Sequence, residues 1–417
     1  MGIKTKLALM SFLQMGAWGA YLTCMGSFLS NVGLADNIGY FYSIQGIVSI
    51  FMPAIIGIIA DRWIQAQRVL SLCHLLAGVF MFAVAWYGYE AGDNVQFGTI
   101  FTLYTVSVAF YMPTIGLSNS VAFNALTKNG YDTVKAFPPI RVFGTVGFIF
   151  MMILVDVLGF QTTSFQFAVS GLISMLMMAY SLTLPACKLA KTGKSKSLAD
   201  ALNLKAFMLF KNPRMGLFFL FSLLLGVCLQ ITNGYANPFL SSFAAVPEYA
   251  DSFGVNHANI LISLSQMSET LCILLIPFFM KRFGIKNVML ISMIAWVLRF
   301  GLFGIGNPGD GVWLFILSMI VYGVAFDFFN ISGSLFVDRS TRPEIRSSAQ
   351  GLFMLMTNGL GATLGTVGAG WVVNHFVYNA SRPDWSAAWF VFAAYALVVA
   401  LLFVLLFREK MPVGDKK

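Results

Sequence analysis

The stretch SMIVYGVAFDFFNISGSLFVD, residues 318–338, is long and apolar enough to cross a bilayer, yet it carries a carboxylate at Asp327. Four aromatic residues lie close to Asp327 in the sequence: Tyr322, Phe326, Phe328 and Phe329. A charged and unpaired carboxylate at membrane depth costs about 2.5–3.5 kcal/mol. Such a residue pairs with a cation, takes up a proton or lines a wet cavity. All three outcomes are more typical of transport than of scaffolding.

The composition indicates an integral membrane protein. Of the 417 residues, 58% are hydrophobic and 10% are charged, whereas a soluble domain carries about 25% charged residues. The apolar runs are longer than about 18 residues and lack short alternation, so we predict spanning helices rather than a barrel. The net charge of +9 is distributed over the loops, so nucleic acid is not an expected partner. The five scattered cysteines predict neither a disulfide nor a metal site.

Twelve spans are predicted, at about residues 7–31, 37–60, 69–89, 97–125, 138–160, 164–186, 214–241, 256–280, 287–306, 311–337, 346–376 and 386–408. If both termini are cytoplasmic, all 26 Lys and Arg residues except Arg141, Arg299 and Arg382 lie in inner loops or tails. This bias follows the positive-inside rule, so we expect both termini in the cytoplasm.

The longest inner loop contains KLAKTGKSKS, residues 188–197, and divides the spans into six and six. We therefore predict a six-helix bundle over residues 1–186, a cytoplasmic linker over 187–213, and a second six-helix bundle with a short tail over 214–417. Similar segments at corresponding positions favour pseudo-symmetry between the halves. GIIADRW corresponds to PFFMKRFGIK, and Ile140-Arg141 corresponds to Ile345-Arg346. Such an all-α, polytopic protein binds its substrate between the halves, near the membrane midplane.

Gly57, Asp61 and Arg62 form a GxxxDR pattern that resembles the loop signature of the major facilitator superfamily. Asp61 and Arg62 are expected to pair near helix ends and to act as a conformational latch on the cytoplasmic side. A charged loop that only obeys the positive-inside rule explains Arg62 but not Asp61.

Four spans carry polar or aromatic residues at the spacing of one helix face. These residues are Arg141, Thr145 and Phe148 in the fifth span, Gln230 and Asn233 in the seventh, Gln266 and Glu269 in the eighth, and Tyr322 and Phe326 beside Asp327 in the tenth. Amides and carboxylates suit hydroxyls and heterocycle edges, and aromatic faces suit ring stacking. The set favours a neutral polar organic substrate, either a base joined to a sugar or a hexose or oligosaccharide.

Several of these residues also have a structural interpretation. Gln230 and Asn233 can bond to neighbouring helices, at about 0.6 kcal/mol each. Arg141 can extend to the headgroups, and Phe148 and Phe326 can be ordinary packing residues. Glu269 lies mid-span, which favours a functional role.

Arg299 also lies mid-span, in a helix expected to be peripheral. A structural ion pair is as good an explanation for it as a transport role, so we leave it outside the predicted site.

Asp327 and Glu269 are the candidates for proton coupling, because a carboxyl group that alternates between dry and wet surroundings can load and release a proton. Arg141 is a candidate switching partner. The sequence has no GxxxxGK[ST] loop and no HExxH or GxSxG motif in its spans, so we expect neither an ATP-driven pump nor an enzyme. No cofactor is expected, and the proton is the expected coupling ion.

Five segments resemble the nucleoside:proton symporter family of the major facilitator superfamily, including the enterobacterial nucleoside and xanthosine permeases. They are FPPIRVFGTVGF (137–148), LQITN (229–233), SQMSET (265–270), KRFGIKNVM (281–289) and VYGVAFDFFNISGS (321–334). The resemblance runs through nearly the whole chain and weakens over residues 187–200 and after Arg408.

The resemblance implies a multi-pass permease of the bacterial inner membrane that imports nucleosides such as uridine, adenosine or inosine together with protons. It implies proton coupling at Asp327. It implies nucleoside contacts at nine residues: Arg141, Thr145, Phe148, Gln230, Asn233, Gln266, Glu269, Tyr322 and Phe326. We expect a monomer in the lipid bilayer. The alternatives are a sugar:proton symporter of the same fold and a non-transporting membrane sensor.

Overall fold

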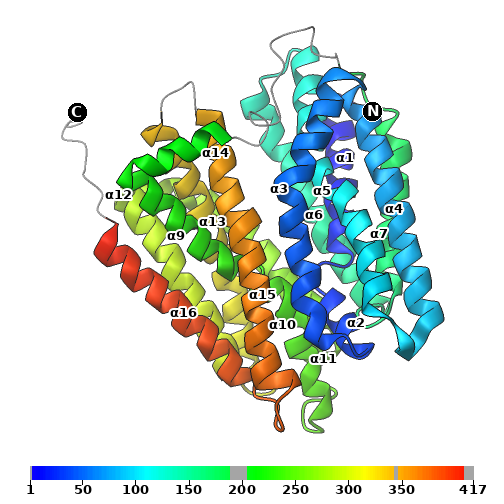
Figure 1. The fold of residues 1–417 in the computed structure, drawn as a ribbon, viewed down its shortest axis with the longest axis vertical. Coiled ribbons are helices and arrows are strands. Elements are labelled where there is room, and N and C mark those ends of the chain that lie inside the picture. Colours follow the sequence, from blue (N-terminus) through cyan, green and yellow to red (C-terminus); the bar gives the residue numbers. More distant parts are fainter. Residues whose placement is uncertain (1, 188–203, 342–345, 408–417) are drawn as a thin grey trace.

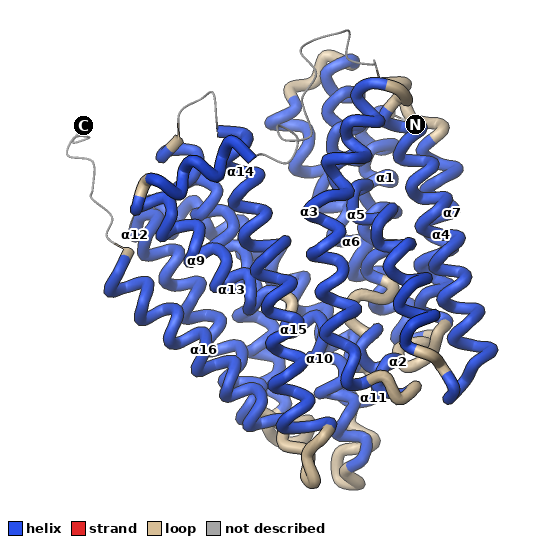
Figure 2. The backbone as a smooth tube through the Cα atoms, in the orientation of Figure 1, coloured by secondary structure: helices blue, strands red, loops and turns tan. Residues whose placement is uncertain are grey.

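The computed structural model describes residues 2–187, 204–341 and 346–407, and all regular elements within these ranges are helices (Figure 2). The predicted all-α class is therefore confirmed. The predicted linker, residues 187–213, falls largely outside the described residues, so the domain limits stay a prediction.

The first half of the chain forms one bundle (Figure 1). Its first span consists of α1 (Ile3–Gly19) and α2 (Met25–Asn31), with a break between them over residues 20–24. The other helices of this bundle are α3 (Ile38–Arg62), α4 (Ala66–Ala91), α5 (Phe97–Lys128), α6 (Thr133–Val157) and α7 (Phe165–Ser181). Helix α1 packs mainly against α6, and α4 packs against both α5 and α7.

The second half forms the other bundle. Its helices are α9 (Pro213–Leu229), α10 (Ile231–Ser242), α11 (Phe253–Asn256), α12 (Ala258–Ile305), α13 (Val312–Ser340), α14 (Arg346–Met354), α15 (Ala362–Val373) and α16 (Trp385–Leu406). Helix α9 begins where the side chain of Asn212 accepts a hydrogen bond from the backbone N–H of Arg214, with Pro213 in the first turn. Two π-helical segments, Leu355–Gly361 and Asn374–Tyr378, follow α14 and α15.

The helix α12 contains two spans. At Gly284 the backbone turns into the left-handed region, with φ of 75°, which glycine adopts without the steric cost that a side chain brings. Nine helices within the described residues are long and apolar enough to cross a membrane. Because α12 holds two spans, the first span is broken and α7 has 17 residues, this number agrees with the twelve predicted spans.

The bundles touch through α3 and α15, α6 and α12, and α2 and α10. A Cβ atom on Gly39 of α3 would lie 2.7 Å from the backbone oxygen of Thr366 in α15, so this contact depends on a glycine. In Figure 1 the bundles meet at the end that contains α2, α10 and α11, and they diverge toward the end where α1 begins. We call the end where the bundles meet the closed end and the end where they diverge the open end.

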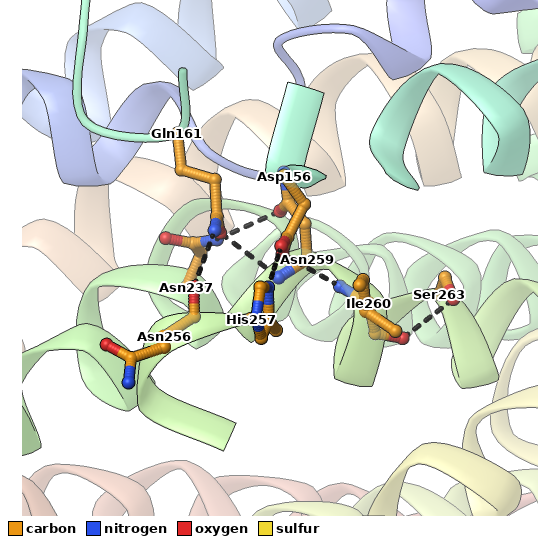
Figure 3. A network of polar contacts seen from close by, with 8 residues as sticks. All are labelled: Asp156, Gln161, Asn237, Asn256, His257, Asn259, Ile260 and Ser263. Atoms are coloured by element: carbon orange, nitrogen blue, oxygen red, sulfur yellow. Dashed lines mark hydrogen bonds and ion pairs between the residues drawn. The ribbon is translucent and has the colours of Figure 1, made fainter. Parts of the chain in front are cut away.

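Polar side chains join the bundles at the closed end (Figure 3). Asp156 Oδ1 lies 2.5 Å from His257 Nδ1, and Asp156 Oδ2 accepts a hydrogen bond from the backbone N–H of Ile260 at 3.2 Å. Gln161 Oε1 accepts hydrogen bonds from Asn237 Nδ2 at 3.0 Å and from the backbone N–H of Asn259 at 3.1 Å. The closed-end network, Asp156, Gln161, Asn237, His257 and Asn259, therefore links the first half of the chain to the second.

Candidate functional site

The ten predicted site residues come from both bundles. Arg141, Thr145 and Phe148 lie on α6 of the first bundle, and the other seven lie on or between α9, α10, α12 and α13 of the second. The five charged or amide side chains other than Asp327 are partly exposed, although they belong to mid-span segments: Arg141, Gln230, Asn233, Gln266 and Glu269. Their partial exposure leaves polar atoms of these side chains accessible to a ligand or to water.

Charges from the two bundles meet at α6 and α12. Glu269 interacts electrostatically with Arg141, which lies on the other bundle. Glu269 also interacts with Tyr322 and with the second carboxylate, Asp327. The predicted switching partner Arg141 therefore lies within electrostatic range of Glu269, and Glu269 lies within electrostatic range of Tyr322 and Asp327 on α13.

The aromatic part of the site is on α13. The rings of Tyr322 and Phe326 are stacked, with centroids 5.7 Å apart and planes inclined by 13°. Trp296 of α12 meets Tyr322 edge-on at 5.9 Å. Phe326 is partly exposed and lines a cavity of about 430 Å³ together with residues that include Asn330 and Asn358. This ring offers a substrate a flat face that is already supported from behind.

Asp327 differs from Glu269 in its surroundings. It is 5% exposed, and its buried Oδ2 atom has no hydrogen-bond partner among the described residues. A charged carboxylate in such a place is costly, because neither water nor a donor stabilises its Oδ2 atom. The neighbouring charge of Glu269 adds repulsion. The geometry therefore suits a protonated Asp327.

The break between α9 and α10 presents two amides. Gln230 ends α9, and its Oε1 accepts a hydrogen bond from Asn233 Nδ2 at 2.8 Å. This bond leaves the Nε2 donor of Gln230 and the Oδ1 acceptor of Asn233 for a ligand. The two residues pair with each other, which differs from the alternative expectation that they bond to neighbouring helices.

The α6 residues are held against α1. Phe148 is 5% exposed and meets the ring of Trp18 edge-on at 6.3 Å. Thr145 is partly exposed and lies one turn from Arg141 on the same helix face. Gly19 of α1 lies directly against the backbone of Phe148, so a larger residue there would push the two helices apart.

The sequence interpretation missed Trp18 and Trp296 as neighbours of the site, and it left Arg299 outside the site. Trp18 donates a hydrogen bond from Nε1 to Gln45 Oε1 at 3.1 Å, and Trp296 and Arg299 support Tyr322 from α12. The sequence did contain a signal for the α12 neighbours: Trp296 and Arg299 are three residues apart and so share one helix face, as the predicted site residues within each span do.

No described carboxylate forms an ion pair with Arg299, so the structural ion pair considered for it is absent from the described part of the chain. The side chains of Asp61 and Arg62 lie outside the described residues, so the latch stays a prediction. Within the described residues no cluster of three His, Cys, Asp or Glu has a metal-site arrangement.

Comparisons with known proteins show the family of the chain. A family model described as "Nucleoside H+ symporter" matches residues 1–412. The xanthosine permease of Escherichia coli is 50% identical over 98% of this chain and 96% of its own length. The nucleoside permease NupG of Escherichia coli is 45% identical over 100% of this chain and 99% of its own.

Solved structures extend the comparison. A crystal structure of the nucleoside transporter NupG covers 98% of this chain and 100% of that chain, with 45% identity and a TM-score of 0.90. The xylose transporter XylE of Escherichia coli, in an inward open conformation, is 14% identical with a TM-score of 0.67 over 98% of this chain and 96% of that chain. The second likeness concerns the fold alone.

Proposed function

The chain belongs to the nucleoside H+ symporter family, and we propose that its proton-coupled import of nucleosides uses the site formed by α6, α9, α10, α12 and α13. One observation supports the assignment of this site: Arg141 of one bundle lies within electrostatic range of Glu269 of the other, and Glu269 lies within electrostatic range of Tyr322 and Asp327. A ligand held there touches both bundles, which alternating access requires.

Each part of a nucleoside has a matching group in this site. The base stacks on Phe326, whose ring is backed by Tyr322, or on Phe148. The pair of Gln230 and Asn233, together with the groups of Gln266 and Glu269, binds the hydroxyls of the ribose and the edges of the base. Uridine, adenosine and inosine all present these features.

Asp327 carries the coupling proton in this proposal, and no other cofactor takes part. The support is its burial and its Oδ2 atom without a partner among the described residues. When the cavity opens to water the proton can leave, and repulsion by Glu269 then favours its return.

We further propose that the open end faces the cytoplasm, with both termini there and the protein in the bacterial inner membrane. The distribution of Lys and Arg supports this orientation. The conformation described here is then open to the cytoplasm. The protein acts as a monomer in this proposal, because the site needs only the two halves of one chain; its mass in detergent checks this point.

The test is uptake of radiolabelled uridine and inosine into proteoliposomes, with and without an inward proton gradient. Wild-type protein is expected to accumulate both, and Asp327→Asn to bind and exchange uridine without accumulating it. Excess glucose or lactose should leave uptake unchanged. Undiminished accumulation by Asp327→Asn would move the coupling proton to Glu269, and absence of nucleoside uptake under every gradient would refute the function.

A further inference from the structure

Arg299 is the buried cation of the second bundle. It is 2% exposed and lies in the half of α12 that precedes α13. Its Nη1 atom donates hydrogen bonds to the backbone oxygen of Ser318 at 2.8 Å and to Ser265 Oγ at 3.3 Å. In return, Ser318 Oγ donates to the backbone oxygen of Arg299 at 2.9 Å. The guanidinium is thus fixed between the two spans of α12 and α13.

The charge of Arg299 is not neutralised by an acid within the described residues. Its Nε atom is buried and has no hydrogen-bond partner among them. Instead its guanidinium carbon lies 4.4 Å from the ring centroid of Tyr322 and 5.4 Å from that of Phe303. Burying a cation in this way is expensive unless aromatic faces and dipoles compensate it. For helix packing alone, an apolar residue of the same size would serve better.

The ring that Arg299 contacts is part of the proposed substrate site. Tyr322 stacks on Phe326 and interacts with Gln266 and Glu269. Its ring is therefore held by the cation, by the edge of Trp296 and by Phe326. A cation close to a phenol ring draws electron density from it and makes the hydroxyl group a stronger hydrogen-bond donor.

We propose that Arg299 is a positioning and specificity-determining residue for nucleoside binding: it fixes the plane of Tyr322 and strengthens the Tyr322 hydroxyl as a donor to an acceptor atom of the substrate. The acceptor is a ribose oxygen or an oxygen or nitrogen of the base. This inference rests on the proposed function, because it assigns Tyr322 to the nucleoside site. Arg299 itself acts only through Tyr322.

The experiment measures uridine binding and uptake for Arg299→Met and Arg299→Lys, alone and in a Tyr322→Phe background. Arg299→Met is expected to raise the Kd and KM for uridine about tenfold while Vmax changes less than about twofold, since one hydrogen bond from a well-positioned donor to the substrate is worth about that much. Arg299→Lys keeps the charge but not the planar fork, so it should recover part of the loss. In the Tyr322→Phe background, the further effect of Arg299→Met should fall below about threefold.

Ser292→Ala is the matched control, because Ser292 also bonds from α12 to α13, but its Oγ donates to the backbone oxygen of Ala325 and not to Tyr322. It should leave the Kd for uridine unchanged. An unchanged Kd in Arg299→Met, or an equal loss in the presence and absence of the Tyr322 hydroxyl, would overturn the inference. If Arg299→Met does not fold, the Kd of Arg299→Lys for uridine is compared with that of the wild type instead, and an unchanged Kd would then overturn the inference. Failure of the proposed function is distinguishable, since wild-type protein would then bind no uridine.

Discussion

At the scale of single residues, the site separates two carboxylates that are close to each other. Glu269 has an arginine from the opposite bundle within electrostatic range, whereas Asp327 has the like charge of Glu269 within that range. An opposite charge favours the ionised form of a carboxylate and a like charge favours the neutral form, so Glu269 is ionised more readily than Asp327. In the proposed mechanism, Glu269 therefore binds the substrate while Asp327 carries the proton.

The stacking face of Phe326 gives a prediction at the same scale. Phe326→Leu removes the ring while keeping an apolar side chain, so the Kd for uridine should rise about 3- to 10-fold. Free ribose has no base to stack, and its weak binding should not change. Isothermal titration with both ligands provides the measurement.

The control for this prediction is Phe278→Leu, because Phe278 of α12 is 60% exposed and packs edge-on against Phe279. Its uridine affinity should equal that of the wild type. If ribose binding weakened as much as uridine binding in Phe326→Leu, the assignment of Phe326 to the base would be wrong.

At the scale of helices, the first span of each half is broken. The break between α1 and α2 and the junction of α9 and α10 at Gln230 occur at corresponding places in the two bundles. The distal pieces, α2 and α10, then pack on each other at the closed end. The breaks thus allow the halves to touch at that end while exposing polar groups of Gln230 at the site.

The closed-end network gives a prediction for these helices. Asp156→Ala leaves His257 and the backbone N–H of Ile260 without their acceptor. Loss of bonds to a charged group should shift the population toward opening at this end by about tenfold or more. The native thiol of Cys24, which is buried between α1 and α2, should then react correspondingly faster with a membrane-impermeant maleimide.

Asp93→Ala is the control for this measurement, since Asp93 lies in the short helical turn Gly92–Asn94, outside the network. It should leave the labelling rate of Cys24 unchanged, and Cys228, buried in the second bundle, should stay unreactive in all variants. A Cys24 rate in Asp156→Ala equal to that of the wild type would show that the network does not hold this end closed.

At the scale of the whole molecule, two six-span bundles touch at one end and diverge at the other (Figure 1). The proposed ligand groups lie on helices of both bundles, so in this proposal a bound nucleoside stabilises a state in which the bundles approach each other. Rocking of the bundles about the site would then break the closed-end network and open that end.

The proposed orientation gives a prediction at this scale. Asp93→Cys and Lys128→Cys place thiols at exposed positions after α4 and at the end of α5, on opposite ends of the molecule. In intact cells an impermeant maleimide should label Asp93→Cys, and it should label Lys128→Cys only after permeabilisation. The five native cysteines are buried, which keeps the background low. The reverse pattern would contradict the orientation.

The sequence alone determined the properties that depend on neighbours along the chain. Hydropathy marked the twelve spans, the distribution of Lys and Arg indicated an orientation, and helical periodicity collected the polar stripes around residues such as Arg141 and Glu269. Family resemblance then supplied the substrate class. These signals are local, because each depends on composition or on spacings of three or four residues.

Only the tertiary structure decided which stripes meet. The pairing of Asp156 with His257 spans 101 residues of sequence, and the approach of Arg141 to Glu269 depends on how α6 and α12 pack. The sequence position of Arg299 left open whether it forms an ion pair or has a transport role. In the structure its guanidinium lies over the ring of Tyr322. Such contacts follow from the packing of helices remote in sequence, which a helical pattern within one span does not encode.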